Sequence, residues 1–188
     1  MLPSPFSLLP KGSASPLTLR RGEFLFRHEL PTKGMFLAVN IDVHLVRVGP
    51  DGEAILIHRA VAGSCFAEAS LFSETYHCDA IAQGDGTVWQ IKKSAILNAL
   101  KQPEFSASYC QYLTVQVQQM RQVSEIIAIR SAEERVYAAL VAGLLNGQVI
   151  DFAATISLSH EATYRALRKL VRQGRVENPK RGIYHLLA

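Results

Sequence analysis

The side chains most able to do chemistry lie close together near the C-terminus, between residues 159 and 172. Arg165 can donate two hydrogen bonds to O6 and N7 of guanine, and Glu161 can accept one from N4 of cytosine. Residues spaced by three or four positions share one face of a helix. The face that this spacing brings together consists of His160, Glu161, Tyr164, Arg165 and Arg168. The pattern therefore predicts a helix that reads base edges in the major groove of DNA.

The elements around this segment are those needed to position such a helix. Ser159 is a typical N-cap, and Gly174 is a typical C-terminal stop. The opposite, apolar face of the helix consists of Ala162, Ala166, Leu167, Leu170 and Val171. A short helix predicted over Ile150–Thr155 and a tight turn at Ser157–Leu158 precede it, so the segment is expected to be a helix-turn-helix.

A basic hairpin is predicted after the helix. Residues 175–177 and 183–187 are expected to be two strands joined by Asn178–Gly182, with Lys180 and Arg181 at the tip. Such a wing can lie on phosphates. The cations expected to contact phosphates are Arg168, Arg172, Lys180 and Arg181. An amphipathic helix with a solvated basic face is the simpler alternative, but helix, turn, helix and basic hairpin in this order favour DNA binding.

The charge of the chain supports a polyanion as partner. The 188 residues hold 20 Lys and Arg against 16 Asp and Glu, a net charge of +4. Residues 1–130 are nearly neutral, with 12 basic and 11 acidic side chains, whereas residues 159–188 hold 7 basic and 2 acidic ones. A basic block at the end of a nearly neutral chain is typical of nucleic-acid binding.

Several other classes of protein are excluded or disfavoured. No apolar run reaches the roughly 18 residues of a membrane span, and the N-terminus lacks the pattern of a secretory signal, so no membrane partner and a cytoplasmic location are expected. Three cysteines without a CxxC spacing indicate reduced thiols.

The chain divides into a β-rich part and a helical part, which predicts an α+β protein. Short β-type runs between residues 20 and 92 are typical of a β-barrel or jelly roll, and residues 1–19 are expected to be an irregular arm. Pro103 opens a helix to about residue 129 with two apolar stripes, one for its own domain and one for a second copy of the chain; a core helix of a single chain is the alternative. A capping box at Ser131 and Glu134 starts a further helix through Leu145, ended by Asn146–Gly147. The expected domains are a β-barrel or jelly-roll domain with its arm (1–102), a dimerisation helix (103–130) and a winged helix that binds DNA (131–188).

Three segments together resemble the cyclic-AMP receptor and fumarate–nitrate reduction (CRP/FNR) family of bacterial transcription regulators. Residues 21–26 are similar to the opening of the family's β-roll, and residues 63–72 to its Gly-x-x-Phe-Gly-Glu-x-x-Leu-Phe stretch. Residues 159–165 are similar to its recognition-helix pattern Ser-Arg-Glu-Thr-x-x-Arg. The resemblance covers roughly residues 20–188. It implies an effector-sensing β-roll, a homodimer formed by the long helix, a palindromic double-stranded DNA site, RNA polymerase as a further partner and an unidentified small-molecule effector.

The chain departs from this family at the effector pocket. The positions that the resemblance assigns to that pocket are Cys65, Glu68, Cys78, Asp79, Gln119 and Met120. Cys78 and Asp79 stand where cyclic-nucleotide-responsive members carry the Arg-Ser pair that holds the phosphate, and the loss of the guanidinium removes a bidentate anchor. We therefore expect no useful affinity for cyclic AMP or cyclic GMP. At the DNA, His160 replaces an Arg, so weaker or pH-sensitive discrimination is expected at that base pair.

The sequence leaves other sensing modes and an enzymatic role as alternatives. No cofactor is expected and no residue is assigned to a metal, but Cys65, His77 or Cys78 could serve a haem, metal or thiol-based sensor. A constitutive DNA binder with a vestigial sensor is a further alternative. A cupin-type metalloenzyme is least favoured, because the histidines are scattered singly and no catalytic residues can be assigned.

Overall fold

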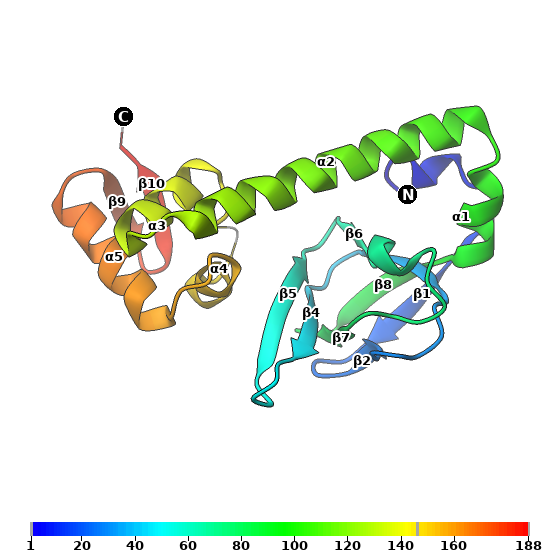
Figure 1. The fold of residues 1–188 in the computed structure, drawn as a ribbon, viewed down its shortest axis with the longest axis horizontal. Coiled ribbons are helices and arrows are strands. Elements are labelled where there is room, and N and C mark those ends of the chain that lie inside the picture. The colour runs from blue at the N-terminus through cyan, green and yellow to red at the C-terminus, as the bar shows by residue number, and fades with distance from the viewer. Residues whose placement is uncertain (1, 146, 188) are drawn as a thin grey trace. The chain divides into compact units, whose positions relative to one another are not determined.

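The computed structural model describes residues 2–145 and 147–187 and has the α+β architecture expected from the sequence (Figure 1). Its contacts divide it into two compact units, residues 1–113 and 114–188, and the division falls inside the long helix α2. The first unit contains, in chain order, η1 (Phe6–Leu8), β1 (Ala14–Leu19), β2 (Phe24–Phe26), β3 (Gly34–Ala38), β4 (Val43–Val48), β5 (Ala54–Ala60), β6 (Cys65–Phe66), η2 (Glu68–Ser70), β7 (Asp79–Ala82), β8 (Gly86–Lys92), α1 (Lys93–Ala99) and the start of α2 (Pro103–Ala128).

The strands of the first unit form two antiparallel four-stranded sheets. One has the order β1-β8-β3-β6 and the other the order β2-β7-β4-β5. Burial alternates along β4, where Val43 and Leu45 are buried and the residues between and after them are less so. This alternation turns one face of each strand toward a shared core.

The core between the sheets is rich in stacked aromatic rings. The Phe26 and Tyr76 rings stack with their centroids 3.8 Å apart, and Phe36 stacks on both Phe26 and Phe66 at 5.5 and 5.6 Å. The buried Tyr76 hydroxyl accepts a hydrogen bond from the Lys33 backbone N–H at 3.0 Å, so its polar end is satisfied.

The N-terminal segment is not the irregular arm that the sequence predicted. Residues 14–19 form β1, which pairs with β8 so that Ala14 lies opposite Ile91 and Leu19 opposite Gly86. Pro16 obscured this strand, but β1 is an edge strand, where a residue without an N–H is tolerated. Phe6 is fully buried and meets the rings of Tyr109 and Tyr112 edge-on, at 6.2 and 5.5 Å.

The helix predicted from residue 103 to about 129 is present as α2, from Pro103 to Ala128. Phe105 and Tyr109 bury its first turns in the core of the first unit. The Tyr112 hydroxyl donates a hydrogen bond to the Cys65 carbonyl at 3.3 Å. Farther along, Val117 and Met120 are exposed, so this part of α2 carries apolar side chains on its surface.

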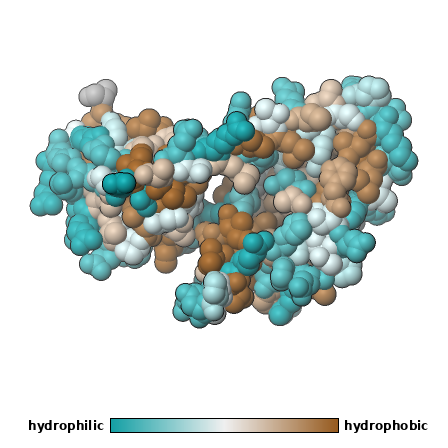
Figure 2. Space-filling view, viewed as in Figure 1, coloured by the Kyte–Doolittle hydropathy of each residue, from teal (hydrophilic) through white to brown (hydrophobic). Residues whose placement is uncertain are grey.

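A second exposed apolar area lies on the β4–β5 hairpin. The side chains of Val48, Ile55 and Ile57 are about half or more exposed there, and Figure 2 shows hydrophobic residues gathered over this hairpin. β5 is the edge strand of its sheet. The hairpin therefore combines an unpaired strand edge with apolar side chains.

The second unit contains the rest of α2, then α3 (Ala132–Val141), α4 (Val149–Thr155), α5 (His160–Arg172), β9 (Val176–Lys180) and β10 (Ile183–Leu186). The helix predicted through Leu145 ends at Val141 instead, because Gly143 adopts φ +69° and closes the helix two residues later. The backbone N–H groups of Gly143 and Leu144 bond the carbonyls of Leu140 and Ala139, the pattern of a Schellman C-cap. Asn146, part of the predicted stop, lies outside the described residues. None of the described helices is long and apolar enough to cross a membrane.

The buried position of Phe6 gives a direct test of the N-terminal packing. Replacement Phe6→Ala is expected to lower the free energy of unfolding of the first unit by about 3 kcal/mol, because it leaves a cavity beside two aromatic rings. Urea unfolding followed by fluorescence of Trp89, the chain's single tryptophan, measures this directly. Leu8→Ala is the matched control, since Leu8 is 47% exposed. A loss below about 1 kcal/mol for Phe6→Ala would show that the segment is not part of the core.

Candidate nucleic-acid interface

The helix-turn-helix predicted near the C-terminus is present as α4, a turn at Ile156–Leu158, and α5. Ser159 caps α5, with its Oγ accepting a hydrogen bond from the Ala162 backbone N–H at 3.1 Å. Ser157 adopts φ +53° in the turn, a left-handed conformation that suits Gly better than Ser. α4 ends at Thr155 and α5 begins at His160, so the chain changes direction sharply between them, at Ser157.

A buried stripe holds α5 against the rest of the second unit. Leu167 and Leu170 are fully buried and share a core with Phe152, Ile156 and Val136. The sequence placed Ala162 and Val171 in this stripe, but both are only half-buried. Thr163 is fully buried in their place, and its hydroxyl donates to the Ser159 carbonyl at 3.0 Å. Thr163 escaped the apolar pattern because its polar group is satisfied inside the helix.

The opposite face of α5 carries the side chains that the sequence assigned to DNA. His160, Glu161, Arg165, Arg168 and Arg172 are exposed, and Tyr164 is half-buried. The His160 and Tyr164 rings meet edge-on, with centroids 4.6 Å apart. The Tyr164 ring thus lies against the His160 ring on this face.

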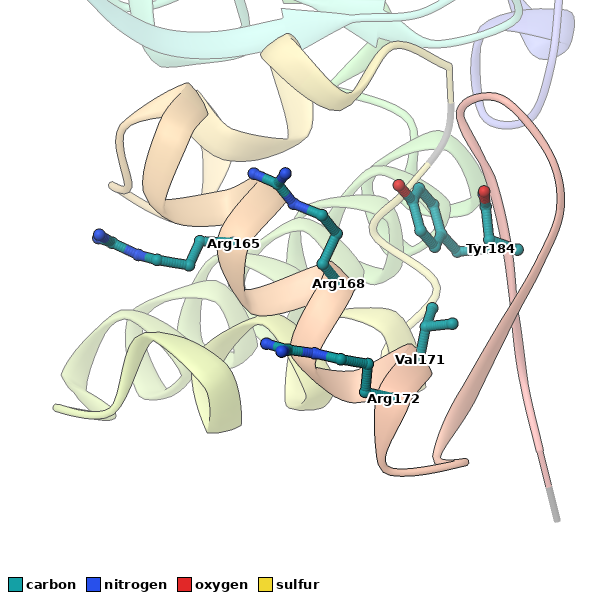
Figure 3. Close-up of a pocket in the computed structure, with 6 residues that line it drawn as sticks. Arg165, Arg168, Val171, Arg172 and Tyr184 are labelled. Atoms are coloured by element: carbon teal, nitrogen blue, oxygen red, sulfur yellow. The ribbon is translucent and has the colours of Figure 1, made fainter.

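α5 and the hairpin β9–β10 line an open groove of about 490 Å³, and three of its lining residues are arginines. In Figure 3 the three arginine side chains leave the same side of α5, and Tyr184 comes from the wing. The groove is lined by Arg165, Arg168, Val171, Arg172, Asn178 and Tyr184. Sequence reasoning found the arginines but missed Asn178 and Tyr184, because their place depends on how the hairpin folds back on the helix.

The wing is the hairpin β9–β10, with Arg181–Gly182 as its turn. Asn178 closes it: its side-chain amide donates to the Lys180 carbonyl at 2.9 Å and to the Ile183 carbonyl at 2.6 Å. Lys180 and Arg181 are exposed at the tip, as the sequence predicted. A hairpin of this kind can present two cations to a phosphate backbone.

Two cations of the basic block are held in ion pairs with carboxylates of α3. Arg175 binds both carboxylate oxygens of Glu134, at 2.6 and 3.1 Å, and its guanidinium carbon lies 3.7 Å from the centre of the Tyr137 ring. Lys169 pairs with Glu133. Hydrogen bonds from these partners hold the pKa of both carboxyl groups below the ordinary range, so both are ionised near neutral pH. In the predicted capping box, the Glu134 carboxylate would accept a hydrogen bond from the Ser131 backbone N–H. In the structure this carboxylate binds Arg175 instead.

Arg135 ties the turn before α5 to the end of α2. Its Nε donates to the Ile129 carbonyl at 2.8 Å, and its Nη1 donates to the carbonyls of Ile156 and Ser157 at 3.3 and 3.2 Å. A single guanidinium thus donates to backbone carbonyls of the segments that precede and follow α3 in the chain.

The effector-pocket positions of the first unit are mostly buried or already bonded. Cys65 and Cys78 are buried free thiols. Burial, with the nearby Glu68 carboxylate, raises the pKa of Cys65 to about 12, and burial raises the pKa of Cys78. Both thiols are protonated near neutral pH, and a thiol is a poor nucleophile and metal ligand. Asp79 accepts a hydrogen bond from the His28 backbone N–H at 2.7 Å.

The turn before Glu68 explains a family preference that this chain does not follow. Ala67 adopts φ +69° immediately before η2, at the position where the family pattern has Gly. The remaining pocket positions, Gln119 and Met120, are exposed on the part of α2 that belongs to the second unit. Within residues 2–145 and 147–187, no group of three or more His, Cys, Asp and Glu side chains is arranged to hold a metal ion.

Comparisons with known proteins agree with this fold. Residues 16–103 match the cyclic nucleotide-binding domain family. No curated protein matches the sequence. Over nearly its whole length the chain is similar in structure to FixK2 from Bradyrhizobium japonicum, with a TM-score of 0.76, 19% identity and 93% of each chain covered. It is also similar to CLP, described as a c-di-GMP-responsive global regulator of Xanthomonas campestris, with a TM-score of 0.68, 14% identity and 94% and 95% covered. A Thermus thermophilus transcriptional regulator of the CRP/FNR family matches with a TM-score of 0.62, 18% identity and 93% and 94% covered.

The left-handed turn before α5 gives a second prediction. Ser157→Gly is expected to raise the free energy of unfolding of the second unit by about 0.5–1 kcal/mol, because relief of the left-handed strain outweighs the added chain entropy of Gly. Loss of helical circular dichroism in urea measures it. Ser159→Ala is the control of opposite sign, since it removes the α5 cap and should cost about 1 kcal/mol. A destabilising Ser157→Gly would contradict the assigned turn.

Proposed function

We propose, on the premise that this chain carries a cyclic nucleotide-binding domain and the CRP/FNR fold, that it is a dimeric, sequence-specific DNA-binding transcription regulator. The observation that carries the proposal is the exposed basic face of α5 beside the wing. The structural relatives named above include transcription regulators, which supports this function.

In this proposal, α5 lies in the major groove and its first two turns read the bases. Arg165 donates to the O6 and N7 of a guanine, and Glu161 accepts from a cytosine amino group, which gives each half-site a G·C-containing core. His160 meets the neighbouring base pair, supported by the Tyr164 ring.

Phosphate contacts come from the groove and the wing. Arg168 and Arg172 line the groove, and Lys180 and Arg181 stand at the tip of the hairpin. Because Arg175 and Lys169 are paired with carboxylates, these four cations are the stronger candidates for counterion release on binding.

A second copy of the chain is the proposed partner along α2. Val115, Val117 and Met120 are exposed on this helix, and pairing of two copies would cover them. Two recognition helices placed about 34 Å apart would then enter successive major grooves of a palindromic site. RNA polymerase is a further proposed partner, and the proposed location is the cytoplasm.

The effector of the first unit is proposed not to be a cyclic nucleotide. Cys78 supplies no guanidinium. The guanidinium of the nearby Arg47 is already hydrogen-bonded within the protein, because its Nε and Nη2 donate to the His77 carbonyl at 3.2 and 2.8 Å. Asp79 would repel a phosphate. An unidentified small molecule, or no effector at all, fits these residues better. A thiol-based sensor at Cys65 is disfavoured by its raised pKa.

Base readout by α5 can be separated from phosphate binding by two substitutions. Arg165→Ala is expected to weaken binding to a DNA site selected from random sequence by about 1–3 kcal/mol and to relax the preference at one base pair. Lys180→Ala is expected to weaken all sequences alike and to reduce the slope of log K against log salt by about 1. Fluorescence anisotropy with the selected site and its single-base variants, over a salt series, measures both.

The two variants serve as controls for each other, since both remove one exposed cation of the second unit. Unchanged base preference in Arg165→Ala would remove α5 as the reading element. Absence of any sequence preference in the wild-type protein would contradict the proposed function itself.

Cyclic-nucleotide binding is tested by calorimetry with cyclic AMP and cyclic GMP. We expect no binding at micromolar ligand, because the bidentate phosphate anchor is missing. Cys78→Arg is the informative companion, since it restores a guanidinium at the family position. A micromolar dissociation constant for the wild-type protein would refute the assignment of the pocket.

A further inference from the structure

Arg175 lies where three parts of the second unit meet. Its backbone N–H donates to the Leu170 carbonyl at the end of α5, and its carbonyl accepts from the Leu187 N–H after β10, both near 3 Å. Its side chain binds α3 through Glu134 and Tyr137. One residue thus joins the end of the recognition helix, the base of the wing and the helix behind them.

The geometry of the side chain is that of a clamp. The two parallel hydrogen bonds to Glu134 fix the plane of the guanidinium, and the Tyr137 ring lies over it. Glu134 and Tyr137 are three residues apart on α3, so they reach Arg175 from the same face. The side chains of the Arg175–Glu134 pair are 32% and 51% exposed, and such a pair adds little to stability. Its directional bonds can nevertheless set an orientation.

We propose that Arg175 is a positioning residue for DNA binding, which acts through Glu134 and Tyr137 to hold the wing and the end of α5 in one orientation. This inference rests on the proposed DNA-binding function. It assigns to a residue of the basic block a role that its charge does not reveal, because the positive charge is offset by Glu134.

The sign of the effect of Glu134 separates this role from simple electrostatics. Glu134→Gln removes a negative charge from the second unit, so charge alone predicts tighter binding to the DNA polyanion. Loss of the clamp predicts weaker binding. We expect Glu134→Gln and Arg175→Ala each to weaken binding by roughly 2- to 30-fold, the range for residues that act through others. Arg175→Lys keeps the charge without the planar fork, so it should also bind more weakly than wild type.

Coupling to the wing provides a readout that loss of folding would not move. If Arg175 positions the wing, Lys180→Ala should cost much less affinity in the Arg175→Ala protein than in the wild type. In the matched control background, Arg172→Ala, an exposed cation of α5 outside the clamp, Lys180→Ala should cost its full amount. A smaller folded fraction would scale every affinity alike and leave the effect of Lys180→Ala unchanged.

The experiment uses the full chain and the selected DNA site, with anisotropy titrations of the single and double variants and circular dichroism to confirm the folded fraction. Weaker binding by Glu134→Gln together with a reduced effect of Lys180→Ala in the Arg175→Ala background supports the clamp. Tighter binding by Glu134→Gln, or an unchanged effect of Lys180→Ala, overturns it. Failure of the wild-type protein to select any DNA sequence would instead refute the proposed function, so the two failures are distinguishable.

Discussion

The burial of Leu167 and Leu170 is the constraint on which the basic surface depends. Both side chains are withdrawn completely from solvent, against residues of α3 and α4. Burying each contributes roughly 1.5–3 kcal/mol, more than any exposed ion pair in this unit could. Since residues 165, 168 and 172 lie on the other side of the helix, this packing alone determines that their guanidinium groups face outward. Electrostatics then decides only what those groups can bind.

The charge of the last 30 residues is better understood once its members are separated by their contacts. Arg175 and Lys169 look equivalent to their neighbours in the sequence, yet both are held by glutamates of α3. The cations outside these two ion pairs are concentrated on one face of α5 and at the tip of the wing. A concentrated positive patch attracts a polyanion more strongly than the same charge spread over the unit.

Local patterns predicted most of the second unit, and long-range pairing explains most of what they missed. Ser159 and Gly174 marked the ends of α5 correctly, because caps depend on nearby backbone groups alone. The strand β1 was missed, since its partner β8 lies some 70 residues away and Pro16 is a poor strand former. The pairing of Arg175 with Glu134, 41 residues apart, was equally invisible. The effector-pocket positions were inferred only from the family resemblance. Among them, the structure shows Cys65 and Cys78 to be buried.

Arg135 and the core beneath it couple the end of α2 to α5. Ile126 of α2 is buried in the same core as Leu167, so the end of α2 cannot shift without disturbing the packing of α5. The Arg135 guanidinium adds directional bonds to this contact, from Ile129 beyond α2 to the turn that precedes α5. Packed cores tolerate discrete rearrangements better than gradual ones. A change in the proposed pairing of two copies along α2 would therefore reach α5 as a change of orientation of the whole helix rather than of single side chains.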